Sequence, residues 1–555
     1  MQQLNIKQLL AVTLCGSFLM FGCSMAELEK VSINKINADL NKVPSAAGFV
    51  ATSASVDNQL YTGSGNNYYV CDTGDDNNSG TSTNDPFKSF DKAMQVFTSM
   101  SAGGSVLFCR GGVFQTSTVR KLANFRCSKS TACSLSDYGN TSLSRPIIVA
   151  HGVNALNFEE GGNADQDGGY SISNLILKST TSSGVGIRFY NNVDDVIMEN
   201  LQIEGFKIGV YSAGSNTPNS GSNKINENLT LRNSFLFSNA GGGWLGGCSD
   251  CKIINNKFEN NGFAKAVFDH NLYFSNPWKS SPATNVLISG NTLYRSTMVN
   301  GKCQGVSLVV HGQVDDLTIE KNYIHEDAGA VSDRCWGISV DPAYFTEEAF
   351  KKLIIRNNKL ENMGNIGIGC ASCEGVIITN NIITDDSGVM SWGIKVPVRG
   401  EDALKSKNVE IDANSIKAVG LSSTGIEVGG VNPFVVTNND IALLSNTNNC
   451  IEKYGANTLT DTTLNTCVQG GKAVVDNSSA VSSSITINDP MVTEEPMVTE
   501  EPMVTEDPMV TEEPMVTEDP MVTEDPMVTE EPMVTEEPMV TEEPMVTEEP
   551  MVTEE

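Results

Sequence analysis

The chain has little positive charge, few aromatic residues and almost no histidine. Its 555 residues contain 36 Lys and Arg against 67 Asp and Glu, with only 4 His and 4 Trp. Because nucleic-acid recognition needs a basic surface, this balance argues against a nucleic-acid partner. After the first 22 residues, no apolar run is long enough to cross a bilayer as a helix. A nucleophile elbow, a phosphate loop, a nucleotide fingerprint and a zinc-protease motif are also missing.

What the chain does have is one short phrase that recurs between about residues 170 and 444. Two or three apolar residues precede an Asn, and another apolar pair follows it. The ten Asn lie 23 to 36 residues apart, an interval that indicates a solenoid. Strand-like runs with Gly and Asn breaks, and no sustained helical period, predict a parallel β-helix with one coil per repeat. The ten are Asn174, Asn200, Asn233, Asn256, Asn291, Asn322, Asn358, Asn381, Asn414 and Asn439.

Each coil carries a second strand-like phrase. A Gly-apolar-x-apolar run follows most of these Asn by 12 to 16 residues, so every coil needs at least two strands. The Asn would fall at the bend after the first strand, where side-chain amides can hydrogen-bond from coil to coil as a ladder. We therefore expect these Asn to be structural and not catalytic.

The first 22 residues resemble a bacterial secretory signal, with an apolar stretch from Leu9 to Phe21. Cys23 and Ser24 follow, and this resembles the lipobox of bacterial lipoproteins, although Met20 stands where Leu is usual. The resemblance implies cleavage before Cys23, lipidation of that residue and attachment to the membrane through the lipid. Ser24 resembles outer-membrane sorting, so we expect an outer-membrane lipoprotein that faces the periplasm or the cell surface.

The last 66 residues are eleven copies of Pro-Met-Val-Thr-Glu-Glu/Asp, and they carry 22 of the 31 net negative charges. With a Pro every sixth residue and no aromatic residue, this tail is expected to be disordered. The predicted layout is a signal at 1–22, a tether at 23–67, a cap with the first coils at 68–165, the β-helix repeats at 166–475, and a Ser-rich linker with the acidic tail at 476–555.

The cysteines support export. Of the 14 Cys, one is lost with the signal and Cys23 carries lipid, which leaves an even number for an oxidising compartment. Cys303 and Cys335 each stand two residues before the Gly of successive coils, so they should stack. A zinc site at the two CxxC motifs is the alternative, but the motifs lie four coils apart. The expected disulfides are Cys71–Cys109, Cys127–Cys133, Cys248–Cys251, Cys303–Cys335, Cys370–Cys373 and Cys450–Cys467.

The stretch from Tyr68 to Phe114 has a distinctive order. A strand is followed by a G-x-D-x-x-x-G-T loop at Gly74 to Thr81, a Pro-Phe pair, an amphipathic helix from Phe90 to Met100 and a strand with a Gly-rich turn. This order resembles the opening of secreted right-handed β-helix proteins of the pectate-lyase-like superfamily. The resemblance implies an all-β, right-handed, single-stranded parallel β-helix whose open N-terminal end is capped by the helix. No family-specific catalytic motif matches, so no catalytic residues are carried over.

The first loop also offers oxygen ligands, from Asp72, Asp75, Asp76, Asn77 and Asn78. Such side chains can hold calcium, or they can cap the backbone of a turn, which is the interpretation we favour. Polysaccharide lyases of the resembling superfamily often use Lys or Arg with calcium, so calcium stays open as a cofactor.

Aligning the second strands on their Gly predicts one polar outer face. Apolar residues at the first and third positions point inward, so the second and fourth point out. The densest patch runs from Asp269 to Asp341 and includes Arg334, with His270, His325 and Glu326 nearby. The whole face is predicted to collect Arg188, Tyr190, Tyr211, Tyr273, Ser307, His311, Ser339, Asp341, Lys395, Arg399 and Glu427.

This patch suits β-elimination in a uronate polysaccharide. Arg334 or Lys395 would neutralise the uronate, His311 would take the C5 proton and Tyr273 would protonate the leaving oxygen. A hydrolase would instead use two carboxylates, Asp341 with either Asp269 or Glu326.

Three further residues, Arg188, Tyr190 and Tyr211, are expected to bind substrate. Trp336 and Trp392 share the inward parity of His270 and are expected in the core. Trp244 and Trp278 lie in loops, where they can stack on sugars or seal a coil. The sequence thus predicts a monomeric surface protein that acts on an extracellular polysaccharide as a lyase; the alternative is a non-catalytic glycan-binding or adhesive protein.

Overall fold

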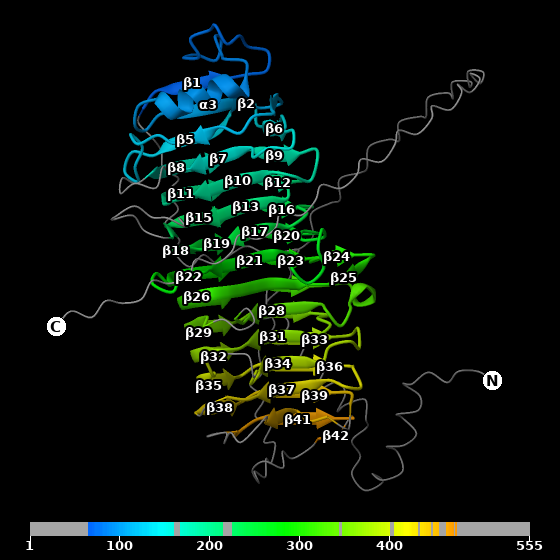
Figure 1. Cartoon of the computed structure of the whole chain (residues 1–555). Coiled ribbons are helices and arrows are strands. Elements are labelled where there is room, and N and C mark those ends of the chain that lie inside the picture. Colours follow the sequence, from blue (N-terminus) through cyan, green and yellow to red (C-terminus); the bar gives the residue numbers. More distant parts are fainter. Residues whose placement is uncertain are drawn as a thin grey trace, which may run out of the picture. The chain divides into compact units, whose positions relative to one another are not determined.

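The described residues wind into a parallel β-helix with three strands in most coils, stacked beneath a helix at the N-terminal end (Figure 1). The computed structural model describes residues 65–159, 167–214, 225–342, 347–399, 404–430, 433–445, 448–453, 462–470 and 472–473. The predicted signal, Cys23, the tether up to residue 64, and the linker and acidic tail lie outside the described residues. Among the described residues, no helix is long and apolar enough to traverse a membrane.

Sheet A contains the first strand of each coil, which precedes the bend with the recurrent Asn. Its neighbours are parallel and in register over the length of the solenoid. It consists of β1 (Asn67–Val70), β2 (Ser105–Cys109), β5 (Cys133–Tyr138), β8 (Asp167–Ser173), β11 (Val193–Glu199), β15 (Leu229–Arg232), β19 (Lys252–Ile254), β22 (Ala283–Ser289), β26 (Val306–Glu320), β29 (Ala349–Arg356), β32 (Cys373–Thr379), β35 (Lys407–Asp412) and β38 (Phe434–Thr437).

Sheet B follows the bend and has the shortest strands. All its pairings are parallel except that of the last two strands. It consists of β3 (Val113–Thr116), β6 (Ile147–Ala150), β9 (Ile176–Ser179), β12 (Gln202–Glu204), β16 (Phe235–Phe237), β20 (Lys257–Glu259), β23 (Thr292–Tyr294), β27 (Tyr323–His325), β30 (Lys359–Glu361), β33 (Ile382–Asp385), β36 (Ser415–Ala418), β39 (Asp440–Leu443), β41 (Thr466–Gln469) and β42 (Lys472–Ala473).

Sheet C completes each coil and carries the Gly-apolar-x-apolar phrases. Strand β26 is 15 residues long and continues from sheet C into sheet A, so it joins the two sheets. The other strands of sheet C are β4 (Lys121–Leu122), β7 (Leu156–Glu159), β10 (Val185–Tyr190), β13 (Ile208–Ala213), β17 (Gly242–Gly246), β21 (His270–Asn276), β28 (Trp336–Val340), β31 (Ile366–Cys370), β34 (Trp392–Val396), β37 (Thr424–Val428) and β40 (Ile451–Lys453).

Short elements lie in the connections between these strands. They are the pair β14 (Asn226–Glu227) and β18 (Cys248–Ser249), the antiparallel pair β24 (Met298–Val299) and β25 (Lys302–Cys303), and the single turn η1 (Ala328–Ala330). The predicted capping helix is confirmed as α3 (Phe90–Ser99). Its N-cap is Ser89, whose hydroxyl accepts the Lys92 N–H at 3.1 Å. It buries Phe90, Ala93, Met94 and Phe97 over the first coils and thereby covers their apolar interior.

The predicted Asn ladder exists, but only seven of the ten Asn belong to it. The Asn256 side-chain oxygen accepts the Ser234 N–H, and from Asn291 onward each ladder oxygen accepts both the backbone and the side-chain N–H of the preceding ladder Asn. The ladder also includes Asn465, which the repeat pattern missed. Each member is fully hydrogen-bonded, which an amide buried away from water requires.

The three early residues, Asn174, Asn200 and Asn233, are corrections to that prediction. They stand one residue before the ladder position, at positive φ. Left-handed backbone tolerates Asn better than most residues, so both positions of the bend favour Asn and the sequence alone does not separate them.

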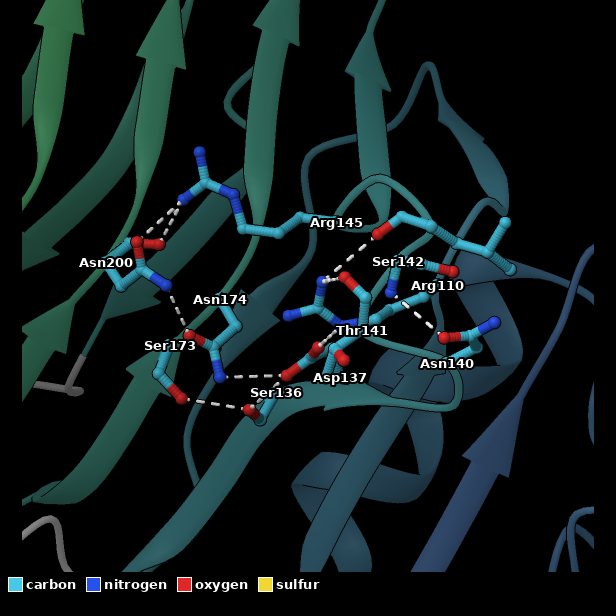
Figure 2. Close-up of polar contacts among 11 residues, drawn as sticks. Arg110, Ser136, Asp137, Asn140, Thr141, Ser142, Arg145, Ser173, Asn174 and Asn200 are labelled. Atoms are coloured by element: carbon cyan, nitrogen blue, oxygen red, sulfur yellow. Dashed lines mark hydrogen bonds and ion pairs between the residues drawn. The ribbon is translucent and has the colours of Figure 1, made fainter. Parts of the chain in front are cut away.

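Two of these early residues, Asn174 and Asn200, form a separate, outer chain of polar contacts (Figure 2), whereas Asn233 Nδ2 donates to Glu199 Oε1 at 3.1 Å. Asn200 Nδ2 donates to Asn174 Oδ1 at 2.7 Å, and Asn174 Nδ2 donates to Asp137 Oδ1 at 2.8 Å. Asp137 also pairs with Arg110, whose Nε lies 2.5 Å from Oδ2. Arg145 Nη1 contacts both oxygens of Asn200, so the outer chain is tied down at each end.

All six expected disulfides are present. The zinc alternative is therefore not supported, because the CxxC sulfurs are bonded to each other. Cys303 and Cys335 lie 5.2 Å apart at Cα, near the predicted stacking distance. The strand register that led to this pair was nevertheless wrong by two residues, because Leu308 and not Val306 pairs with Ile338. Cys303 lies in the hairpin strand β25 and reaches its partner from there.

Candidate functional site

The outer face of sheet C carries two cavities. We name them for their lining: the acid cavity contains Asp341, Lys395, Arg399 and Glu427, and has a volume of about 540 Å³. The aromatic cavity contains Tyr190, Tyr211, Tyr273 and Trp278, and has a volume of about 200 Å³. Both are built by outward side chains at the ends of sheet C strands and by the connections that follow them.

Two ion pairs organise the acid cavity. Arg399 follows β34 and reaches back across the face, so that its Nη1 lies 3.0 Å from Asp341 Oδ2. The other oxygen of Asp341 accepts the Ser339 hydroxyl at 2.8 Å. Lys395 of β34 pairs with Glu427 of the neighbouring β37, with Nζ and Oε1 3.3 Å apart. Each carboxylate is therefore held by a fixed cation and remains on the cavity wall.

Two indole rings complete this cavity. Trp336 and Trp392 begin β28 and β34, and both are half-buried and line the cavity, so the expectation that they are core residues is wrong. The Trp392 Nε1–H donates to Glu427 Oε2 at 2.7 Å, and Lys395 Nζ lies 3.2 Å from the centre of the Trp392 ring. These contacts fix the Trp392 ring plane beside the carboxylate.

Between the cavities lies a cluster around His311. The His311 ring is edge-on to Tyr273, with centroids 5.4 Å apart, and its Nδ1 contacts the Asp341 carbonyl oxygen. Glu348 Oε2 lies 3.9 Å from His311 Nδ1 and accepts the Gly312 N–H at 2.8 Å. Burial, reinforced by Glu348, raises the pKa of the Tyr273 hydroxyl above its ordinary value. Tyr273, His311 and Asp341 are thus brought together as predicted, but the sequence analysis did not single out Glu348.

Two of the three expected substrate-binding residues line the aromatic cavity, and the third, Arg188, lies beside them. Tyr190 and Tyr211 are on neighbouring strands β10 and β13, and both line the cavity. Arg188 lies over the Tyr190 ring at 4.3 Å and pairs with Glu159 at 2.9 Å. Trp278 lines the same cavity, whereas Trp244 is fully buried and seals a coil.

Several predicted members do not join the site. Arg334 is exposed in the connection before β28 and lines neither cavity. Ser307 is buried, because the true register places it near the start of β26 and level with Gly337, at the strand position where other coils have Gly. Asp269 and Glu326, the suggested carboxylate partners of Asp341, line neither cavity. The carboxylate that shares the acid cavity with Asp341 is Glu427. The sequence pointed to it by placing an acid opposite the basic Lys395, at the same position of the adjacent coil.

Two histidines that the sequence placed near the patch, His270 and His325, line neither cavity. His270 is buried, as predicted from its parity; burial lowers its pKa to about 3. His325 lies on sheet B, stacked between Tyr294 and Tyr323 with centroids 4.4 and 4.3 Å away. Glu326 follows it into the interior, where burial raises the carboxyl pKa to about 8.

The acidic loop near the N-terminus uses its carboxylates on the backbone. Asp76 Oδ1 accepts the N–H groups of Lys88 and Ser89, and Asp72 Oδ2 accepts that of Val113 at 3.0 Å. Asp75 Oδ1 accepts the Asn77 N–H at 2.9 Å. These contacts are those of a capped turn, the interpretation favoured from the sequence over a calcium site.

No family model matches the chain. Over 358 residues it is 22% identical to a lacto-N-biosidase of Bifidobacterium longum subsp. longum, an alignment that covers 61% of this chain and 21% of that protein. The chain therefore spans about a fifth of that relative's length.

Among solved structures, the chain is similar to a GH136 lacto-N-biosidase from Eubacterium ramulus, with 14% identity and a TM-score of 0.47 over 73% of this chain and 68% of that one. It is also similar to the A-module of the mannuronan C-5 epimerase AlgE4 from Azotobacter vinelandii, with 13% identity and a TM-score of 0.43 over 65% and 91%. At these identities the likeness concerns the fold.

Proposed function

We propose that the protein is a glycoside hydrolase that acts on a neutral extracellular glycan, with the acid cavity as its active site. The observation that carries this proposal is that Asp341 and Glu427 line one cavity together with the indole rings of Trp336 and Trp392. Glycoside hydrolysis uses two carboxyl groups, one as acid and one as base or nucleophile. Aromatic rings supply the apolar surface on which a sugar ring can stack.

The cations of the cavity favour hydrolysis over β-elimination. A lyase must neutralise a uronate with a cation, the role first expected of Lys395 or Arg334. Lys395 is paired with Glu427, Arg399 is paired with Asp341, and Arg334 lines neither cavity. A uronate in the acid cavity would have to displace a carboxylate from its cation, whereas a neutral sugar would leave both pairs intact. The name of the curated relative, a lacto-N-biosidase, supports the same choice over the region of similarity.

The two carboxylates of the acid cavity stand on different coils. Asp341 follows β28 and Glu427 lies on β37, three strand steps away through β31 and β34. At ~4.8 Å per step the backbones are about 14 Å apart, and outward side chains stand roughly perpendicular to the sheet. This spacing is wider than the ~5.5 Å of retaining pairs and also wider than the ~6.5–9.5 Å of inverting pairs, so the two carboxyl groups act on one bond only if their side chains converge over the cavity.

A lyase remains the second candidate because His311 and Tyr273 lie edge to face, as a base and an acid for elimination would. One panel of neutral and uronate polysaccharides separates the candidates. We expect new reducing ends from a neutral glycan, with no rise in absorbance at 235 nm. A rise at 235 nm would replace the hydrolase with a lyase. Binding without cleavage of any polysaccharide would favour the non-catalytic alternative.

We also propose that the protein is a monomeric lipoprotein anchored through Cys23, on the basis of its lipobox-like sequence. Metabolic labelling with palmitate should mark the wild-type protein and should fail in Cys23→Ser. Label that persists in the variant would rule out lipidation at this residue.

A further inference from the structure

We propose that the aromatic cavity is a distal sugar subsite, and that the outer face of sheet C binds one neutral oligosaccharide along the solenoid axis through both cavities. This inference rests on the proposed function of the acid cavity and extends it to a substrate class, a glycan of several sugar units.

The lining of the aromatic cavity fits a neutral sugar. Tyr190, Tyr211, Tyr273 and Trp278 give aromatic surface, while Ser212 and Ser275 add hydroxyl groups to the lining. Aromatic side chains with a polar tip suit a ligand that has both apolar faces and hydroxyl groups. Arg188, which lies over Tyr190, is already paired with Glu159. The cavity is therefore better suited to hydroxyl groups than to an anion.

The two cavities are joined by residues on consecutive strands. Tyr273 of β21 lines the aromatic cavity, and His311 of β26 touches its ring. His311 in turn contacts the carbonyl of Asp341, which lines the acid cavity. The separation is thus bridged by outward side chains of the same face.

The distance sets the size of the ligand. From Tyr211 on β13 to Lys395 on β34 the register runs through β17, β21, β26, β28 and β31, which makes six strand steps. At ~4.8 Å a step this is about 29 Å, a length that requires several pyranose rings. A disaccharide can occupy only one of the cavities, so occupancy of both selects longer chains.

The test measures binding separately from cleavage. The Asp341→Asn protein, which should be inactive, is applied to an array of neutral and uronate oligosaccharides of two to eight sugars. We expect affinity for a neutral series to rise with length and then to level off. Adding Tyr211→Ala or Tyr190→Ala should lower affinity for the long members roughly tenfold and leave the short members unchanged. The matched control is Tyr294→Ala on sheet B, which should change neither.

The outcomes separate this proposal from the proposed function. Length-dependent binding that both tyrosine variants weaken, in a protein whose wild type cleaves nothing, would support the subsite and refute the hydrolase. Cleavage of a neutral glycan with equal affinity losses for short and long members, or with no loss, would refute the subsite alone. Binding of no neutral oligosaccharide on the array would also refute it. Thermal unfolding of each variant shows whether it is folded, and two variants on different strands guard against one that is not.

Discussion

The bend between sheets A and B and the outer face of sheet C are both built from the same repeating coil, yet they differ in regularity. At the bend, buried Asn side chains follow one another from Asn256 to Asn439, and the half-buried Asn465 ends the row; each oxygen after the first accepts the N–H groups of the Asn before it. On sheet C, one column changes residue type from each coil to the next: it runs Tyr211, Leu245, Tyr273, Val309, Ser339, Gly369, Lys395 and Glu427. The same residue recurs at the bend because every coil needs its hydrogen bonds there, whereas the residues that line the cavities differ from coil to coil.

The largest effect should be the loss of activity caused by substitutions on the outer face of sheet C. Asp341→Asn and Glu427→Gln each remove a carboxylate from the acid cavity, and we expect kcat on a cleaved glycan to fall roughly 10²–10⁴-fold. Their melting temperatures should change little. The matched control is Glu259→Gln, an ion-paired carboxylate on the outer face of sheet B, which should retain full activity. A Glu427→Gln protein with normal kcat would remove Glu427 from the mechanism.

The bend should show the opposite pattern, with a loss of stability. Asn358→Ala would leave the buried Asn322 N–H groups and the Ile319 carbonyl without partners. Unsatisfied buried groups cost about 1–3 kcal/mol each, so we expect the free energy of unfolding to fall by roughly 3–5 kcal/mol in urea titration. Asn200→Ala, in the exposed outer chain, should cost less than about 1 kcal/mol. Equal losses in the two variants would contradict the distinction between ladder and outer chain.

One buried acid, Glu326, directly follows strand β27 of sheet B. Burial raises the pKa of Glu326 to about 8, well above the ordinary value of 4.5. Between these values the folded protein holds a proton that the unfolded chain has lost, so wild-type stability should fall as pH rises from about 4.5 to about 8.

Glu326→Gln has no proton to lose, so its stability relative to wild type should increase by a few kcal/mol over that pH window. Urea unfolding at several pH values checks this, with Glu259→Gln, a half-buried and ion-paired carboxylate, as the control. A pH-independent difference between Glu326→Gln and wild type would mean that Glu326 is not protonated in the folded state.

The smallest expected effect compares two disulfides. The Cys303–Cys335 pair closes a separation of 32 residues, and Cys248–Cys251 closes one of 3. In the chain-entropy picture, replacing the first pair with Ala should cost roughly 3–4 kcal/mol and replacing the second roughly 1.5–2 kcal/mol. The difference of about 2 kcal/mol is measurable by urea unfolding of the two double variants. A larger loss from the short pair would show that native-state contacts outweigh loop closure.

The fold was largely predictable because the same sequence pattern recurs in every coil. The recurrent Asn, the alternation of inward and outward residues and the cap from Phe90 onward each specify a local choice that the structure keeps. The errors in the predicted fold came from single positions. An Asn at positive φ and an Asn in the ladder look alike in sequence, as Asn357 and Asn358 show side by side.

The site was less predictable because it depends on contacts between coils. Arg399 and Asp341 meet across 58 residues, after the connection following β34 folds back over the face. The sequence grouped His311 with Asp341, but the register slip at Gly305 offset them by two residues, whereas the structure makes them direct neighbours in adjacent coils. Parity alone placed Trp336 and Trp392 in the core, although their position at the strand start turns them toward the cavity.

Strand β26 has a mechanical consequence. In a solenoid each coil contacts only its neighbours, so one coil can move against the next. We expect such movement to be easiest where the sheets are linked by loops. Strand β26 crosses from sheet C to sheet A without such a loop, so one coil near the middle of the stack is braced by continuous backbone. His311 is therefore held at this corner by strand on both sides, and we expect the spacing between the aromatic and the acid cavity to change little when either end of the solenoid moves.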